Sequence, residues 1–284
     1  PPLWKFLTFT QNFGLDAENQ KSFSHAWSLC IEEQFYLLLP ITIFMIFYFN
    51  FKKGALYLIS SIIILGLALR IYNWSEYVQP LIDAGNFRQM SLVFIEKIYY
   101  PSYNRMDGLL IGVGIACIFN FRPKLKDYLT RHCNIVLIFG LGLFLVAYKV
   151  CENFISYKMA IYGFPLISVA YGLFVIAAIS PTCILYKFKS KATMIIATLS
   201  YSIYLSHKQI YHLTRIGAEK LGFENTSVGI FWVCIGTALI GGFILHWIIE
   251  KPFLRLRNRI LSNDIRTNNE TRFALIFNYF RNKK

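Results

Sequence analysis

Seven long apolar stretches limit what this chain can fold into. They lie at about residues 28–50, 54–72, 103–121, 134–150, 160–183, 192–212 and 227–250. A helix needs about 20 mainly apolar residues to cross the hydrocarbon core of a bilayer. Only 15% of the residues are charged and the mean hydropathy is +0.46, which is typical of membrane proteins rather than soluble domains. We therefore predict an all-α, polytopic transmembrane helical bundle with about seven spans, forming one domain.

The distribution of positive charge predicts how the bundle is oriented. The net charge of +14 would suit a nucleic-acid partner, but its placement favours a membrane. When alternate loops are assigned to one side, 18 Lys and Arg residues fall on one side, 8 on the other and 3 within the spans. Because positive residues concentrate in cytoplasmic loops, we predict a cytoplasmic C-terminus and an outer residue 1. The basic tail can contact anionic lipid, so we expect membrane lipid and no nucleic acid as a partner.

The chain divides into three parts by polarity. We predict an outer segment over residues 1–26, the bundle over 27–250 and a basic cytoplasmic tail over 251–284. Residues 73–102 form the longest predicted outer loop, rich in the Trp and Tyr that favour the membrane interface. Within the tail, we expect the apolar residues 273–280 to lie on the membrane surface.

The six cysteines are scattered singly along the chain, without the paired spacing of a metal or redox motif. We interpret them as small apolar core residues. The sequence contains no glycine-rich phosphate loop, no HExxH and no CxxC. We therefore predict no metal site and no bound cofactor.

A few polar residues inside the spans point to possible chemistry. Glu32 and Glu33 lie about one turn inside the first predicted span, where each ionised group costs about 2.5–3.5 kcal/mol. Such a cost favours a buried partner or a reacting substrate, although acidic residues also stabilise the start of a helix. At 1.5 Å per residue, Glu32, Arg105 and His207 fall in one layer near the outer ends of three spans. This layer is the predicted centre of chemistry.

Several of these charged residues also have structural interpretations. Arg105 can extend to the interface or pair with Asp107, and we expect Arg70, near the outer end of its span, to extend to the headgroups. Glu250 precedes Lys251 and Pro252, a pattern that predicts the end of a helix.

One helical face of the sixth predicted span carries Tyr201, Tyr204 and His207, spaced three residues apart. This stripe can line a polar cavity. Ordinary aromatic packing, with the hydroxyls and the imidazole satisfied inside the bundle, explains it equally well.

Four segments of the chain resemble the acyltransferase-3 family of integral membrane acyltransferases. Residues 27–36, Trp-Ser-Leu-Cys-Ile-Glu-Glu-Gln-Phe-Tyr, resemble its WSLxxEEQFY signature, and residues 104–114 resemble its span with an arginine and glycines. Residues 199–207 resemble its LSYSxYLxH segment, and residues 248–253 its closing IEKPF. The segments occur in family order. Position 206 departs from the pattern, since Ser206 stands where the family often has Trp.

The resemblance implies a bundle of ten spans with both termini in the cytoplasm. Our seven spans with an outer residue 1 then fit a chain that lacks the first three. The histidine proposed as the family's catalytic group lies on the first of these, about three helical turns after an arginine, so the resemblance places it upstream of this chain.

The resemblance also implies the activity and the residues that serve it. We expect a membrane-embedded acyltransferase of the O-acetyltransferase type, which moves an acetyl group from acyl-CoA to a hydroxyl of a cell-surface glycan or lipid-linked sugar. Acetyl-CoA would be the donor substrate, and a bacterial inner membrane the location. The predicted catalytic residues are Glu32, Arg105 and His207. The predicted substrate-binding residues are Trp27, Ser28, Gln34, Tyr36, Tyr201, Tyr204 and Glu250.

Two other interpretations of the same residues stay open. Intramembrane charges and a polar cavity would also serve a transporter or flippase for an amphiphilic substrate. A catalytically inactive relative that binds a partner in the membrane is the third possibility.

Overall fold

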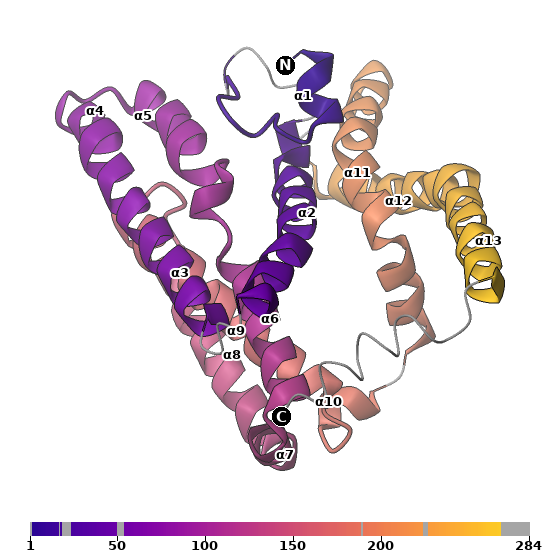
Figure 1. The fold of residues 1–284 in the computed structure, drawn as a ribbon. Helices are drawn as coiled ribbons and strands as arrows, with labels where there is room; N and C mark the ends of the chain where they lie inside the picture. Colours follow the sequence, from indigo (N-terminus) through magenta and orange to yellow (C-terminus); the bar gives the residue numbers. More distant parts are fainter. Residues whose placement is uncertain are drawn as a thin grey trace. The chain divides into compact units, whose positions relative to one another are not determined.

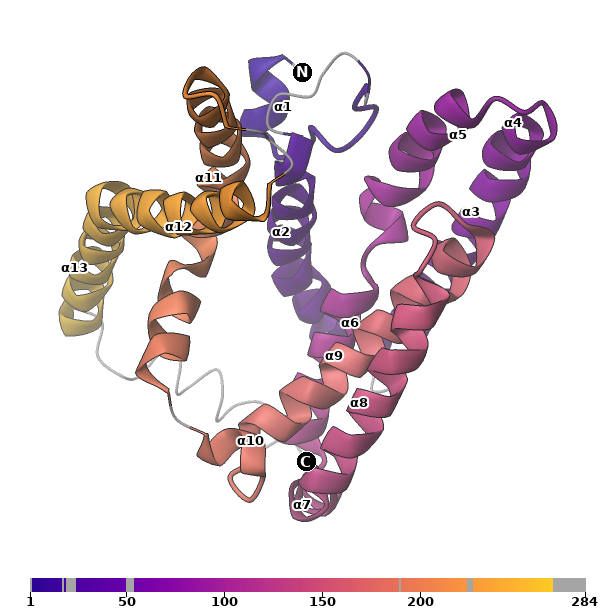
Figure 2. The same ribbon diagram turned by 180° about the vertical axis from the view of Figure 1, so that it is seen from behind.

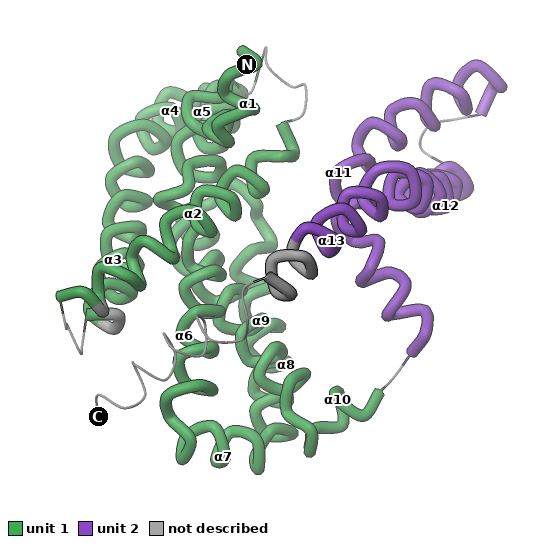
Figure 3. Tube along the Cα trace, turned by 45° about the vertical axis from the view of Figure 1, so that its right-hand side comes forward, with its two compact units in different colours: residues 1–189 green, residues 190–284 purple. Residues whose placement is uncertain are grey.

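The computed structural model describes residues 2–16, 18, 24–49, 54–188, 190–223 and 227–267. These residues form helices and no strand, which confirms the predicted all-α class (Figure 1). They divide into two compact units, residues 1–189 and residues 190–284 (Figure 3). Residues 273–280, for which we predicted a place on the membrane surface, lie outside the described residues.

Several helices are long and apolar enough to cross a membrane, which confirms the polytopic class. In the described part of the chain there are five by length and composition, or six if a bent pair counts as one span. The five are Ser24–Ile46, Tyr57–Asp83, Cys133–Val150, Met159–Ile179 and Val228–Ile260. The bent pair is Asp107–Phe121 and Pro123–Arg131, which meet at 107°.

By this criterion the described residues give one or two spans fewer than the seven that we predicted. The stretch at 103–121 qualifies only as part of the bent pair, and the stretch at 192–212 does not qualify. It lies in α11 (Lys191–Lys220), whose 30 residues are more than long enough. Its polarity excludes α11 from the count of membrane spans, because serines, tyrosines, histidines and Lys208 interrupt its apolar residues.

Unit 1 contains ten α-helices in its described residues. They are α1 (Leu3–Leu7), α2 (Trp27–Tyr48), α3 (Gly54–Asn73), α4 (Gln79–Asp83), α5 (Phe87–Phe94), α6 (Asp107–Phe121), α7 (Pro123–Arg131), α8 (Cys133–Val150), α9 (Phe164–Ile179) and α10 (Ile184–Lys187). Short 3₁₀ turns precede α2 (η1, Ser24–Ala26) and α6 (η4, Ser102–Asn104).

Small residues allow α9 to pack closely against both α8 and α6 (Figures 1 and 2). A Cβ atom added to Gly140 of α8 would meet the Leu173 and Phe174 side chains at 3.1 Å. A Cβ atom added to Gly172 of α9 would lie 2.6 Å from the Ile111 side chain of α6. Glycine at helix contacts in membranes brings two backbones together in this way.

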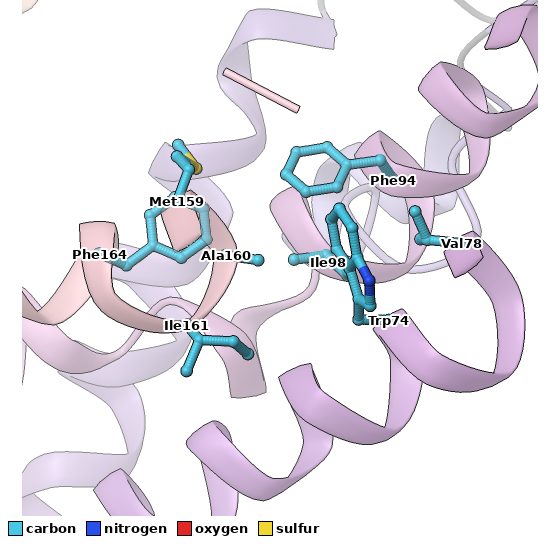
Figure 4. Close-up of a cluster of buried hydrophobic side chains, with 8 residues drawn as sticks. All are labelled: Trp74, Val78, Phe94, Ile98, Met159, Ala160, Ile161 and Phe164. Carbon is cyan, nitrogen blue, oxygen red and sulfur yellow. The ribbon is translucent and has the colours of Figure 1, made fainter. Parts of the chain in front are cut away.

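Three π-helical turns meet in the core of unit 1. They are η2 (Trp74–Val78), η3 (Ile95–Tyr99) and η5 (Met159–Gly163). Their side chains form a buried cluster in which the residues of η5 face those of η2 and η3, with Ala160 opposite Ile98 (Figure 4). Such turns occur often at functional sites, because the extra residue changes the direction of the side chains that follow.

The predicted outer loop over residues 73–102 is wrong in its secondary structure. This segment is mainly helical, since η2 and α4 continue α3 and then α5 and η3 return. Burial explains the difference. Trp74, Val78, Phe94 and Ile98 are each 5% exposed or less, so the segment has a core of its own that its interfacial aromatic composition concealed.

Unit 2 consists of α11, α12 (Val228–Leu245), the π-turn η6 (His246–Glu250) and α13 (Lys251–Thr267). Helices α11 and α12 pack against each other. Gly242 makes this possible, because a Cβ atom there would lie 2.9 Å from the backbone Cα of Ile203.

The helix does not end at Glu250 as the sequence predicted. The wider turn of η6 continues directly into α13, with the N–H of Lys251 bonded to the His246 carbonyl. Pro252 is the second residue of α13. Proline is tolerated in the first turn of a helix, where its missing N–H is not needed, so the chain continues through it.

Candidate active site

Arg105 lies immediately before a helix instead of inside it. Helix α6 begins at Asp107, after the 3₁₀ turn η4. This turn is fixed by Asn104, which is 1% exposed and donates hydrogen bonds to the carbonyls of Lys97 at 2.9 Å and Ile98 at 3.2 Å. The buried amide therefore holds Arg105 in place at the entrance of α6.

Three aromatic rings from three different elements surround the guanidinium of Arg105. Its central carbon lies 3.8 Å from the ring centroid of Phe164, 5.0 Å from that of Tyr99 and 5.4 Å from that of Trp27. We call these three rings the aromatic cage. Ring faces attract a cation electrostatically, by about 2 kcal/mol when the pair is desolvated. The cage thus stabilises the charge without using any of the N–H donors.

No hydrogen bond or ion pair joins the guanidinium of Arg105 to another residue in the described part of the chain, whereas the guanidinium of Arg70 has four polar contacts. Arg70 is fully buried in α3, and its Nη1 lies 3.0 Å from Asp107 Oδ2 while its Nη2 donates to Oδ1 at 3.3 Å. Its Nε donates to the Gly66 carbonyl at 3.2 Å, and its Nη1 to the Ala160 carbonyl at 3.5 Å.

Two expectations for these arginines are corrected by this arrangement. Arg70 does not extend to the headgroups, because its side chain is 0% exposed. Arg105 does not pair with Asp107, because Arg70 takes that carboxylate. The pair thus joins residues 37 positions apart, because α3 lies close to the η4 turn that leads into α6.

The charges around Arg105 leave one positive charge in excess. Asp107, Arg70, Tyr99 and Cys151 lie near enough to influence it electrostatically. Arg70 and Asp107 offset each other. Burial raises the pKa of the Cys151 thiol, although Arg105 opposes this, so the thiol is neutral at pH 7. A surplus cation with available N–H donors is chemically suited to an anion or a developing oxyanion.

Trp27 is the predicted substrate-binding residue that the structure brings to Arg105. Gln34, from the same helix, instead joins a buried polar network. Its amide donates to Asn12 Oδ1 at 3.1 Å, and Asn12 donates to Ser102 Oγ at 2.8 Å. Asn12 is fully buried, so this network attaches the N-terminal segment to α2 and η4. The substrate-handling role of Gln34 stays a prediction.

Glu32 and Tyr36 are exposed on α2 within unit 1. No ion pair joins Glu32 to Arg105 among the described residues, although Trp27 on the same helix reaches the cage. Ser28 is half-buried near the start of α2. Their predicted roles are neither supported nor opposed by these positions.

Unit 2 holds the remaining predicted residues. His207 Nδ1 lies 2.7 Å from the Tyr204 carbonyl, and the two rings are 5.8 Å apart. A carbonyl can only accept, so Nδ1 carries the proton. Because His207 and Arg105 belong to different units, the predicted common layer stays a prediction.

A second polar group in unit 2 surrounds Glu250. Ser202 Oγ donates to Glu250 Oε2 at 2.5 Å, and His246 Nδ1 lies 3.0 Å from the same oxygen. Ser202 is fully buried, and both it and Glu250 line a pocket of about 500 Å³. Tyr201 and Arg257 also line this pocket, whose remaining walls are apolar. Two predicted substrate-binding residues, Tyr201 and Glu250, are thus brought together.

A larger cavity of about 540 Å³ lies within unit 1, between α2, α3 and α6. Apolar side chains line nearly all of it, and Gln34 and Ser102 are among its few polar residues. Gly66 also lines it and allows η4 to approach α3, since a Cβ atom there would lie 2.8 Å from the Tyr103 carbonyl.

Sequence reasoning missed the residues that surround Arg105. The position of Arg70 inside an apolar span indicated a buried partner, because a charged residue there requires one. Nothing in the sequence distinguished Tyr99 and Phe164, since aromatic residues are common throughout this chain. Their contribution depends on the π-turns η3 and η5, which no sequence pattern indicated.

Comparison with known proteins gives two informative similarities. The chain is 31% identical over 219 residues to the peptidoglycan O-acetyltransferase OatA of Listeria monocytogenes, which covers 74% of this chain and 32% of that protein. It is 32% identical over 196 residues to the O-acetyltransferase OatA of Staphylococcus aureus, which covers 66% of this chain and 29% of that protein. These similarities support an O-acetyltransferase family.

The chain spans about a third of the length of the curated relatives it matches. No protein-family profile matches it. No solved structure matches it either.

Proposed function

From this similarity to bacterial O-acetyltransferases, we propose that the chain is a member of the acyltransferase-3 family and forms the membrane-embedded part of an O-acetyltransferase. The substrate that receives the acetyl group is a hydroxyl of a cell-surface glycan or a lipid-linked sugar. The donor is acetyl-CoA. The observation behind the proposal is that aromatic rings hold the guanidinium of Arg105 and leave its N–H groups available as hydrogen-bond donors.

The proposed reaction needs a stabilised oxyanion. A hydroxyl oxygen attacks the thioester carbonyl, the new C–O bond forms and the carbonyl oxygen becomes negative. The C–S bond then breaks, and the CoA thiolate leaves. Arg105 donates hydrogen bonds to that oxygen as its charge develops. Removing one such donor typically costs about 10²–10³ in kcat.

Proton transfer is assigned to other groups. Glu32 accepts a hydrogen bond from the attacking hydroxyl or orients a histidine base, and His207 has a secondary role. The base takes the proton of the attacking hydroxyl, and we assign that role to no residue of this chain. Trp27 binds substrate as one wall of the aromatic cage.

The polar residues around Glu250 in unit 2 are suited to binding the donor substrate, acetyl-CoA. We place the C-terminus in the cytoplasm, where CoA is available. Arg257 lines the pocket that holds Glu250, and Lys251 and Arg255 lie on the same helix. Their positive charges attract the phosphates of CoA.

The test uses membranes from cells that express the protein as its gene encodes it. Acetyl-CoA labelled in the acetyl group is added, and the label released from glycan by mild base is measured. We expect wild-type membranes to form labelled esters and the variants Arg105→Gln and Glu32→Gln to form few. Arg88→Gln is a matched control, because this exposed arginine pairs with Glu18 and is not one of the residues around the cage.

Each result decides between the candidate functions. Wild-type membranes that form no ester in a host with the acceptor would contradict the acetyltransferase proposal. Transport of the acceptor without acetylation would favour the transporter or flippase. Full activity in both variants would leave the enzyme proposal intact and contradict the site.

A further inference from the structure

The carboxylate of Asp107 lies only two residues from Arg105, yet it does not pair with it. Both charges lie near enough to influence each other. An arginine and a carboxylate that lie close together in a desolvated site often form a bidentate pair. Something must therefore keep them apart.

Arg70 occupies the carboxylate from the opposite side. Its Nη1 and Nη2 reach the two oxygens of Asp107 at 3.0 and 3.3 Å. The guanidinium is itself anchored, because the Gly66 carbonyl of its own helix and the Ala160 carbonyl of η5 accept two further contacts. It cannot move toward another acceptor without losing these contacts.

The two arginines share one aromatic ring. Phe164 lies 3.8 Å from the guanidinium carbon of Arg105 and 5.6 Å from that of Arg70. Because Phe164 directly follows η5, whose Ala160 carbonyl binds Arg70, the same turn positions both cations. Of the two arginines that contact Phe164, Arg70 thus has its charge offset by a carboxylate, whereas Arg105 does not.

We propose that Arg70 is a positioning residue, which holds Asp107 away from Arg105 so that the donors of Arg105 stay available to an anionic ligand or a developing oxyanion. The inference rests on the proposed function for the identity of that ligand. The availability of Arg105 can be measured without any substrate. Without Arg70, the carboxylate would turn to Arg105 and neutralise it.

The experiment measures the reactivity of Arg105 with phenylglyoxal, which modifies guanidinium groups that are not engaged by a carboxylate. The full protein is purified in detergent, treated for increasing times and digested, and the modified peptide containing Arg105 is quantified by mass spectrometry. We compare wild type with Arg70→Gln and with the double variant Arg70→Gln/Asp107→Asn. Acetyl transfer is measured on the same samples.

We expect the modification of Arg105 to be about tenfold slower in Arg70→Gln, because the freed carboxylate pairs with it. In the double variant the neutral pair leaves Arg105 as the only charge, so the rate should return to that of wild type. Acetyl transfer should fall and recover in parallel. A merely structural role for Arg70 would not predict this recovery on removal of a second native residue.

Equal Arg105 modification rates in wild type and Arg70→Gln would overturn the proposal. A double variant as slow as Arg70→Gln would also overturn it. If Arg70→Gln does not fold, as judged by gel filtration, the uncharged variant Arg70→Met replaces it, and the same recovery on adding Asp107→Asn is required. An Arg105 that reacts as expected in a protein without acetyl transfer would support the positioning role and contradict the proposed function.

Discussion

The role of an arginine in this molecule is decided by what surrounds its guanidinium. Arg70 and Arg105 contact the same Phe164 ring, but only Arg70 has a carboxylate and two carbonyls as partners. Arg70 therefore joins three elements of unit 1. Arg105 keeps its hydrogen-bonding capacity, which is what an oxyanion needs.

At this scale we predict that Phe164→Leu weakens the site beyond its effect on packing. Leucine retains apolar volume but removes the ring face, a loss of about 0.5–2 kcal/mol of cation–π attraction. Acetyl transfer should fall several-fold more than in Phe174→Leu, a matched control on the same helix whose ring contacts Phe144 and Tyr171. Equal losses in the two variants would show that the ring acts only by filling space.

In each unit, the π-turns set the direction of the functional side chains, and glycines allow the helices to pack closely. In unit 1, three π-turns converge on one cluster and deliver Tyr99, Phe164 and the carbonyl that binds Arg70. In unit 2, η6 allows the helix to continue past Pro252 and brings Glu250 to Ser202. Side-chain direction in both units therefore depends on irregular turns rather than on helical periodicity.

For unit 2 we predict that Gly242→Ala destabilises the packing of α11 on α12. The added methyl would meet the Ile203 backbone at 2.9 Å, which cannot yield as a side chain can, and such overpacking costs about 1–3 kcal/mol. Gly236→Ala on the same helix has open space and should be neutral or slightly stabilising. The thermal midpoint of the purified protein in detergent checks this, and equal midpoints for both variants would contradict the close contact.

At the scale of the whole molecule, the apolar stretches predicted the helices well, because a bilayer requires long continuous runs of apolar residues. The resemblance also pointed to Arg105 and Trp27, which the structure brings together, although their functional roles stay predictions. The Arg70–Asp107 pair was not predicted, because it joins residues on α3 and α6 that only the tertiary fold brings together. Hydropathy does not decide the predicted span at 192–212, because polar residues interrupt the apolar residues of α11.

The orientation of α11 in the membrane can be decided by labelling. If it spans, Ser190 before it and Phe223 after it lie on opposite sides, with Ser190 in the cytoplasm by the distribution of positive charge. Single cysteines at these two positions, with the six native cysteines replaced, are treated in intact cells with a membrane-impermeant maleimide. We expect only Phe223→Cys to react, whereas labelling of both positions, or of neither, would mean that α11 does not cross.

The central claim is that the guanidinium of Arg105 stabilises the oxyanion of acetyl transfer. The most direct measurement is the rate of acetyl ester formation at saturating acetyl-CoA in Arg105→Gln relative to wild type, at equal amounts of folded protein. We predict a fall of about 10²–10³ in kcat with little change in KM, as expected for a donor used mainly in the transition state. An unchanged kcat, or a loss confined to KM, would contradict the claim.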